Sequence, residues 1–282
     1  MYLLDGPVDL RETLGYGQLG PADPCLRLGA HEAWRSTRTP LGPATERVRV
    51  ERGRMLHVEA WGPGAEWLLE RAPLLCGAHD DPSGFRPAQR VLVDLHRRHP
   101  GLRIGRTEAV FEAALRNVVQ QRVLFRDAWR SWQALVRGLD PEPAPGPLQE
   151  LWLPPAPERV ARTPYHVFHR FGIERRRADI MRRAAVVAAR LDEAASMPRE
   201  AAWRRISAVP GIGPWTAARI AVLALGDADA VCLGDLHLPH LVTQALAGEP
   251  RGSDARMLEL LAPYRPHRAR VQRLLLTSAH RG

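Results

Sequence analysis

The sequence predicts a mainly helical protein that begins with a small mixed α/β part. Residues 44–61 alternate between apolar and polar side chains, as in an antiparallel strand pair, whereas most of the chain from Glu108 onward has apolar residues at helical spacing. The chain has 282 residues, of which 45% are hydrophobic, and this is ample for packed cores. The composition changes near residues 101–107, so we expect domains over residues 1–105 and 106–282.

The N-terminal third contains a predicted hairpin and a predicted helix. Val48 and Val50 alternate with charged residues up to a turn at Arg52-Gly53, and the alternation resumes after it. Residues 87–99 place their apolar side chains on one face of a helix. We therefore expect an antiparallel sheet in this domain.

The rest of the chain is expected to be almost entirely helical. Residues 141–157 contain seven prolines and are predicted to form a loop inside the helical part. The predicted helices are 108–137, 158–162, 174–194, 199–207, 214–225, 236–247, 253–261 and 266–279.

Composition favours a nucleic-acid partner, although weakly. The formal net charge is +9, and all 40 basic residues are arginine. Arginine contacts phosphates with a planar pair of donors, but the abundance of alanine and proline shows that nucleotide composition contributes to the bias. The absence of lysine is more informative, because it excludes a lysine Schiff base.

No feature directs the chain to a membrane or to an oxidising compartment. No apolar run approaches the roughly 18 residues of a membrane span, and Asp5 interrupts the N-terminus where a signal peptide would be apolar. The three cysteines are far apart and odd in number, without the spacing of metal ligands. We expect a cytoplasmic monomer with reduced thiols.

A Pro-Gly-Ile-Gly-Pro turn at residues 210–214 joins two of the predicted helices, which gives a helix-hairpin-helix over 199–225. Glycine tolerates positive φ angles, which we expect at Gly211 and Gly213, and Pro214 suits the first helical position. The unpaired N–H groups at Gly211, Ile212, Gly213 and Thr216 would bind a phosphate oxygen. The alternative is a purely structural connector.

The hairpin, Trp215 and the Gly234-Asp235 pair twenty residues downstream together resemble the helix-hairpin-helix DNA glycosylases. Weaker matches in the N-terminal third narrow the resemblance to the DNA-3-methyladenine glycosylase II family. It implies a bacterial enzyme that binds double-stranded DNA, extrudes a damaged base and hydrolyses its N-glycosidic bond. It also implies a sodium or potassium ion at the carbonyls of Val209 and Ile212. No cysteine follows Cys232, so no iron–sulfur cluster and no other cofactor are expected.

Asp235 is the predicted catalytic residue. Breaking an N-glycosidic bond builds positive charge on the sugar, which an ionised carboxylate stabilises. Asp235 also precedes a predicted helix, so it is equally suited to cap that helix. The two roles are compatible.

Other candidates for contact with the damaged nucleotide follow from the resemblance. Trp215 would stack on the base, or it would pack in the core; Tyr16 and His237 would line the pocket. Gln121 interrupts the apolar stripe of the predicted helix 108–137 and would face the flipped nucleotide. Arg122 would fill the gap in the duplex, or it would be an ordinary surface residue.

Two departures from the family pattern concern the choice of base. Arg219 and Arg273 stand where alkylpurine enzymes are expected to have aromatic residues, which suggests a more cationic pocket that prefers neutral lesions. The leading hypothesis is a monofunctional glycosylase for alkylated purines. The alternatives are a glycosylase for deaminated or oxidised bases, a protein that binds damage without catalysis, and a general nucleic-acid binder.

Overall fold

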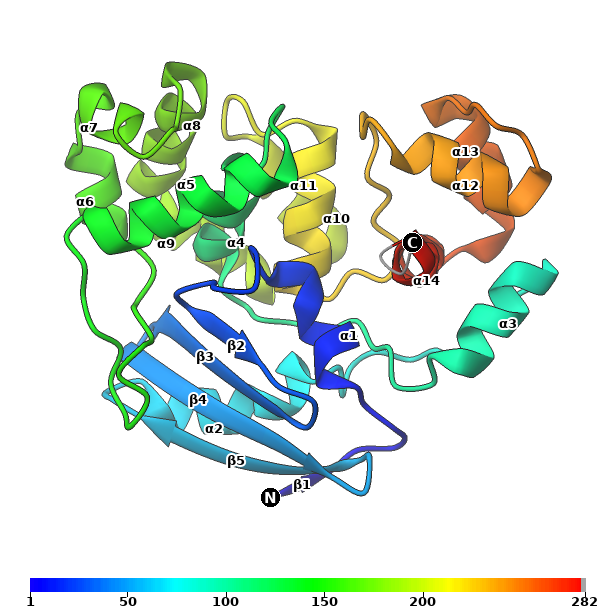
Figure 1. Cartoon of the computed structure of the whole chain (residues 1–282), viewed down its shortest axis with the longest axis horizontal. Coiled ribbons are helices and arrows are strands. Elements are labelled where there is room, and N and C mark those ends of the chain that lie inside the picture. The colour runs from blue at the N-terminus through cyan, green and yellow to red at the C-terminus, as the bar shows by residue number, and fades with distance from the viewer. Residues whose placement is uncertain (280–282) are drawn as a thin grey trace.

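A computed structural model describes residues 1–279 and contains one antiparallel sheet at the N-terminus, followed by helices (Figure 1). The strand order is β1-β5-β4-β3-β2, and all neighbours are antiparallel. The strands are β1 (Tyr2–Leu3), β2 (Leu26–Leu28), β3 (Glu32–Thr39), β4 (Gly42–Glu51) and β5 (Met55–Trp61).

The predicted hairpin over residues 44–61 is confirmed as β4 and β5. Val48 pairs with Val58, and the turn places Arg52 and Gly53 at φ values of 51° and 73°. Strand β3 was not predicted, because polar residues such as Ser36 and Thr37 are buried on it and the apolar alternation is missing.

Helix α2 (Ala65–Leu75) packs against β4 and β5 and buries Leu68, Ala72 and Leu75. The short helix α1 (Leu10–Leu14) has Asp9 as its N-cap, and the Asp9 carboxylate accepts the N–H of Glu12. Neither helix was predicted.

The remaining helices follow the sequence expectations except in three places. They are α3 (Arg90–Arg98), α4 (Val110–Val118), α5 (Phe125–Gly138), α6 (Pro157–Arg162), α7 (Tyr165–His169), α8 (Arg175–Val186), α9 (Ala188–Asp192), α10 (Arg199–Ser207), α11 (Pro214–Ile220), α12 (Leu238–Ala247), α13 (Asp254–Leu261) and α14 (Arg268–Ala279). The predicted helix 174–194 ends at Val186 and restarts as α9, α7 was missed, and the predicted helix 108–137 is two helices.

The prediction of one helix over 108–137 was wrong because the chain turns between α4 and α5. Arg122 has a φ of 55°, which belongs to the left-handed region and ends a right-handed helix. No glycine or proline marks this turn, so helical periodicity alone gave no sign of it.

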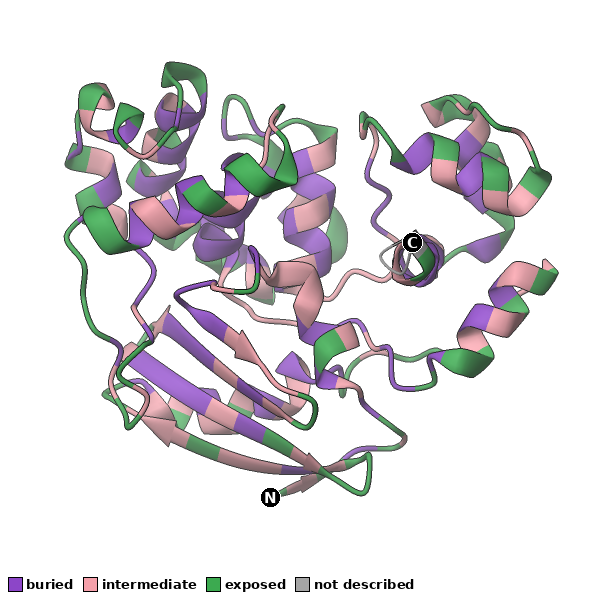
Figure 2. Cartoon of the chain, in the orientation of Figure 1, coloured by how far each residue is buried: buried purple, intermediate pink, exposed green. Residues whose placement is uncertain are grey.

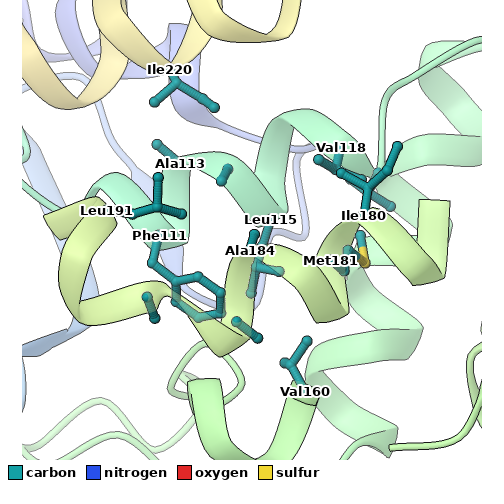
Figure 3. Packing of buried hydrophobic residues seen from close by; sticks show 14 of the residues in the cluster. Phe111, Ala113, Leu115, Val118, Val160, Ile180, Met181, Ala184, Leu191 and Ile220 are labelled. Atoms are coloured by element: carbon teal, nitrogen blue, oxygen red, sulfur yellow. The ribbon is translucent and has the colours of Figure 1, made fainter. Parts of the chain in front are cut away.

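Helix α4 lies at the centre of the larger core, packed against α8, α9 and α11. Phe111 and Leu115 of α4 belong to the same hydrophobic cluster as Ile180, Met181 and Ala184 of α8 (Figure 3). Every residue of α4 is buried, including Glu112, Arg116 and Asn117 (Figure 2).

Buried charges on α4 join the helical part to the sheet. The Arg116 guanidinium lies 2.7 Å from Asp23 and 2.8 Å from Glu112, and Arg35 of β3 lies 2.9 Å from Glu46 and 4.0 Å from Glu112. Removing one member would leave a buried charge without a partner, which typically costs about 3–5 kcal/mol. This network therefore fixes α4, and the helices packed on it, relative to the sheet.

A second core forms around the C-terminal helix α14. Residues from 85 to 104, including Leu92 and Leu95 of α3, pack in the same cluster as residues from 218 to 275. The predicted domain boundary at residue 105 stays a prediction. Within residues 1–279, no helix has the length and apolar character needed to cross a membrane.

Candidate DNA-binding and catalytic site

The hairpin between α10 and α11 depends on Gly211 for its shape. Gly211 has a φ of 99°, and a Cβ atom there would lie 2.4 Å from Cγ1 of Ile180. The expectation of a positive φ at Gly213 was wrong: its φ is −85° and its ψ −179°, an extended conformation open to any residue. A Cβ at Gly213 would meet nothing within 4 Å, so the fold does not demand glycine there.

The hairpin exposes two of the four residues that the sequence predicted for phosphate binding. Gly211, Gly213 and Pro214 are exposed, and the N–H groups of both glycines have no hydrogen-bond partner within residues 1–279. Ile212 is buried, and its N–H donates to the Val209 carbonyl at 3.0 Å. A helix N-terminus with free N–H groups attracts anions.

Gln121 lies in the turn between α4 and α5 and not on a buried helical stripe, so that part of the sequence argument was wrong. Its side-chain amide donates to the Gly211 carbonyl at 3.2 Å and to the Thr216 hydroxyl at 2.8 Å. Gln121 therefore braces the hairpin. Thr216 is only 2% exposed, so a contact with DNA would have to use its main chain.

The carboxylate of Asp235 accepts three hydrogen bonds. One oxygen accepts the N–H groups of His237 and Leu238, each at 2.9 Å, at the start of α12. The other accepts the indole N–H of Trp215 at 2.7 Å. Burial alone would raise the pKa of Asp235, but these donors and the nearby Arg219 guanidinium outweigh it and hold that pKa below its usual value. Asp235 thus stays ionised and accepts two N–H groups at the start of α12, although the N-cap residue of α12 is His237 and not, as the sequence had suggested, Asp235.

Trp215 is half-buried, and its indole N–H donates to the carboxylate of Asp235. The Arg219 guanidinium lies over its ring, with Cζ 5.2 Å from the ring centroid. The stacking of a base on Trp215 stays a prediction.

Tyr16, Arg219 and Arg273 form a compact group, which we call the arginine–tyrosine cluster. The Cζ atoms of Arg219 and Arg273 lie 4.4 and 4.5 Å from the centroid of the Tyr16 ring. The Tyr16 hydroxyl contacts Cys232 Sγ at 3.7 Å. Arg219 links the cluster to Trp215 and so to the region of Asp235. A contact of Tyr16 with a base stays a prediction.

Arg122 and His237 are both exposed. Arg122 holds a left-handed backbone conformation in the turn that carries Gln121 and forms no ion pair within residues 1–279. His237 touches Asp235 through its main chain. His240 is engaged elsewhere, since its Nδ1 accepts the N–H of Gly252 at 3.0 Å.

Sequence reasoning missed Asn117. Its side chain accepts a hydrogen bond from Nε of Arg219 at 2.7 Å and donates to the Ala113 carbonyl at 2.7 Å. The available signal was a polar residue inside the apolar stretch of α4, which needs a partner when buried.

Comparisons with known proteins bear on the fold. No protein-family model matches the sequence, and no curated protein matches it. Among solved structures, the 3-methyladenine DNA glycosylase of Archaeoglobus fulgidus superposes with a TM-score of 0.80 at 20% identity, over 98% of this chain and 97% of that one. The 8-oxoguanine glycosylase/lyase of Clostridium acetobutylicum, bound to DNA, gives 0.73 at 12% identity, over 98% and 93%.

A third similar structure is the 3-methyladenine DNA glycosylase of Schizosaccharomyces pombe in complex with abasic DNA. Its TM-score is 0.54 at 18% identity, over 68% of this chain and 92% of that one. The chain therefore has the fold of the helix-hairpin-helix DNA glycosylases, as the hairpin motif predicted.

Proposed function

We propose that this protein is a monofunctional DNA glycosylase that excises alkylated purines, of the 3-methyladenine type, from double-stranded DNA. The observation that carries the proposal is the Asp235 carboxylate, which three donors hold ionised close to an exposed hairpin. The similarity in fold to DNA glycosylases supports it.

In this proposal the hairpin positions the DNA. The free N–H groups of Gly211 and Gly213 bind a backbone phosphate, and a sodium or potassium ion joins them through the carbonyls of Val209 and Ile212. The Val209 carbonyl already accepts one N–H, which leaves a second lone pair for a cation. Exposed Arg122 enters the duplex where the damaged nucleotide has been extruded, a step that costs a few kcal/mol.

Asp235 then acts on the sugar. As the N-glycosidic bond breaks, positive charge develops on the deoxyribose, and the fixed carboxylate stabilises it while water attacks. Trp215, Tyr16 and His237 surround the base. The chain has no lysine to form a Schiff base, so the abasic product keeps its phosphodiester backbone intact.

The test is to incubate purified protein with duplex DNA treated with a methylating agent, and to identify the released bases by chromatography. We expect free 3-methyladenine and abasic sites that become strand breaks only after alkali. Release of only deaminated or oxidised bases from a lesion panel would contradict the alkylpurine assignment, and binding without release would contradict the enzymatic one.

A further inference from the structure

The buried arginines reveal an imbalance of charge next to the candidate site. Five arginines are buried within residues 1–279, and four of them face a carboxylate. These four pairs are Arg35 with Glu46, Arg116 with Asp23, Arg177 with Glu174, and Arg270 with Asp80. Arg273 is 7% exposed and bonds only to the main-chain carbonyl of Glu12. A buried charge without a counter-charge is costly, and proteins rarely keep one without a use.

Arg219 adds a second positive charge beside Arg273. It is half-buried and forms no salt bridge within residues 1–279, but it lies near enough to Asp235 to lower the pKa of that carboxylate. Asn117 fixes its Nε at 2.7 Å, while its two terminal nitrogens have no hydrogen-bond partner within residues 1–279. The Arg219 guanidinium is thus fixed in position and keeps N–H donors that can bind a ligand.

Tyr16 does not neutralise these two charges. Burial raises the pKa of its phenol well above the usual value despite the neighbouring arginines, so it stays protonated. Burial lowers the pKa of Arg273 to about 10, which still leaves it charged at neutral pH. The arginine–tyrosine cluster therefore carries two positive charges without a salt-bridged carboxylate within residues 1–279, so a bound anion would stabilise it.

Base excision can supply the missing negative charge. When the C1′–N bond breaks, both bonding electrons leave with the base; water adds its oxygen to C1′, and the proton that it loses completes the free base. A neutral base therefore departs as an anion, which a guanidinium stabilises. A cationic methylated base, such as 3-methyladenine, departs neutral, the proton from water is released to solvent, and the departing base gains nothing from the guanidinium.

We propose that Arg219, with Arg273 close to it, extends excision from cationic alkylated purines, such as 3-methyladenine and 7-methylguanine, to neutral ones such as 1,N6-ethenoadenine. This rests on the proposed glycosylase function. Arg219 lies against both Tyr16 and Trp215, and Trp215 contacts Asp235, so a base beside the sugar at Asp235 would lie within reach of its free donors.

The test compares each variant with the wild type on two duplexes, one with a single 1,N6-ethenoadenine and one with a single 7-methylguanine. The N-glycosidic bonds of the two lesions differ in intrinsic lability, so absolute rates are not compared. For each lesion, the single-turnover efficiency kmax/K1/2 (maximal rate constant over the protein concentration that gives half of it) of the variant is divided by that of the wild type. We expect Arg219→Met to reduce excision of ethenoadenine about 10- to 100-fold and that of 7-methylguanine less than threefold.

Arg219→Lys keeps the charge and should restore part of the ethenoadenine activity. Arg52→Met, in the turn between β4 and β5 with an 85% exposed side chain, removes the same charge far from the site and should change neither ratio. Equal losses on both lesions would overturn the inference, because a phosphate contact or a purely structural role acts on all lesions alike. A wild type inactive on every lesion would instead overturn the proposed function on which the inference rests.

Discussion

The carboxylate of Asp235 receives donors from two directions, the first turn of α12 and the indole of Trp215. The sequence allowed either a cap or a catalytic group at this position, and the two roles do not exclude each other in the structure; the catalytic role stays a prediction. The N–H groups that donate to Asp235 at the start of α12 also favour its ionised form. Stabilisation of a cationic sugar requires that form. Trp215 therefore supports Asp235 in addition to any contact that it makes with the base.

At the residue scale, replacing Trp215 by phenylalanine tests this support. Loss of the indole donor should raise the pKa of Asp235. On acidification, the activity of the variant should therefore fall at a higher pH than that of the wild type. A hydrogen bond to a charged group contributes about 1.5 kcal/mol, which corresponds to about one pH unit. The measurement is the pH profile of single-turnover excision of an acid-stable lesion from pH 4 to 8.

Trp203→Phe is the matched control, because the Trp203 indole donates to Asp227, another carboxylate, at 2.9 Å. Its profile should follow that of the wild type. If the Trp215→Phe profile also overlays the wild type, the indole has no influence on the ionisation of Asp235.

Sequence periodicity predicted best the helices and strands whose positions depend on their own residues. The hairpin β4–β5 and helices α10, α12, α13 and α14 lie close to their predicted positions, because apolar spacing, turn glycines and prolines are local signals. The turn between α4 and α5 was missed because it depends on the left-handed Arg122 and on the bond from Gln121 to the hairpin. Both are consequences of tertiary packing.

The two glycines of the hairpin give a prediction at the element scale. Gly211→Ala places a methyl group against Ile180 in a left-handed backbone, which should lower the free energy of unfolding by at least about 2 kcal/mol. Gly213→Ala meets no atom and needs no unusual φ, so stability should change by less than about 1 kcal/mol.

The expected effect of Gly213→Ala is on DNA. A methyl group beside the free N–H would keep the phosphate away and weaken duplex binding about tenfold. Urea denaturation and fluorescence anisotropy with labelled duplex separate the two effects. Unchanged affinity in a stable Gly213→Ala variant would show that the hairpin is a structural connector only.

At the scale of the whole molecule, the candidate site combines segments that are distant in sequence. Tyr16 comes from the short 3-10 helix Gly15–Gly17 after α1, Arg219 from α11 and Arg273 from α14. The sequence indicated each of these residues separately, through the family resemblance, but not that both arginines would lie against one tyrosine. Within residues 1–279, Arg219 and Arg273 form no salt bridge, because the fold places nearby carboxylates against other donors. Asp80, for example, pairs with Arg270.

The buried charges that link α4 to β3 belong to the same scale. Periodicity predicted α4 as a helix with one apolar face, whereas Glu112 and Arg116 are buried on it because the sheet supplies Arg35 and the N-terminal loop supplies Asp23. No local pattern encodes such pairs. They hold the sheet against the helices that carry the hairpin.

The most direct test of the central claim is the single-turnover excision rate of Asp235→Asn beside that of the wild type, on duplex DNA with one alkylated purine. Asparagine has nearly the same shape but no charge, so it cannot stabilise the cationic sugar. The account predicts a rate at least about 100-fold lower, with duplex affinity near that of the wild type. The melting temperature should fall, because one amide oxygen cannot accept both the Trp215 indole and the main-chain N–H groups of α12. A rate within about threefold of the wild type would contradict it.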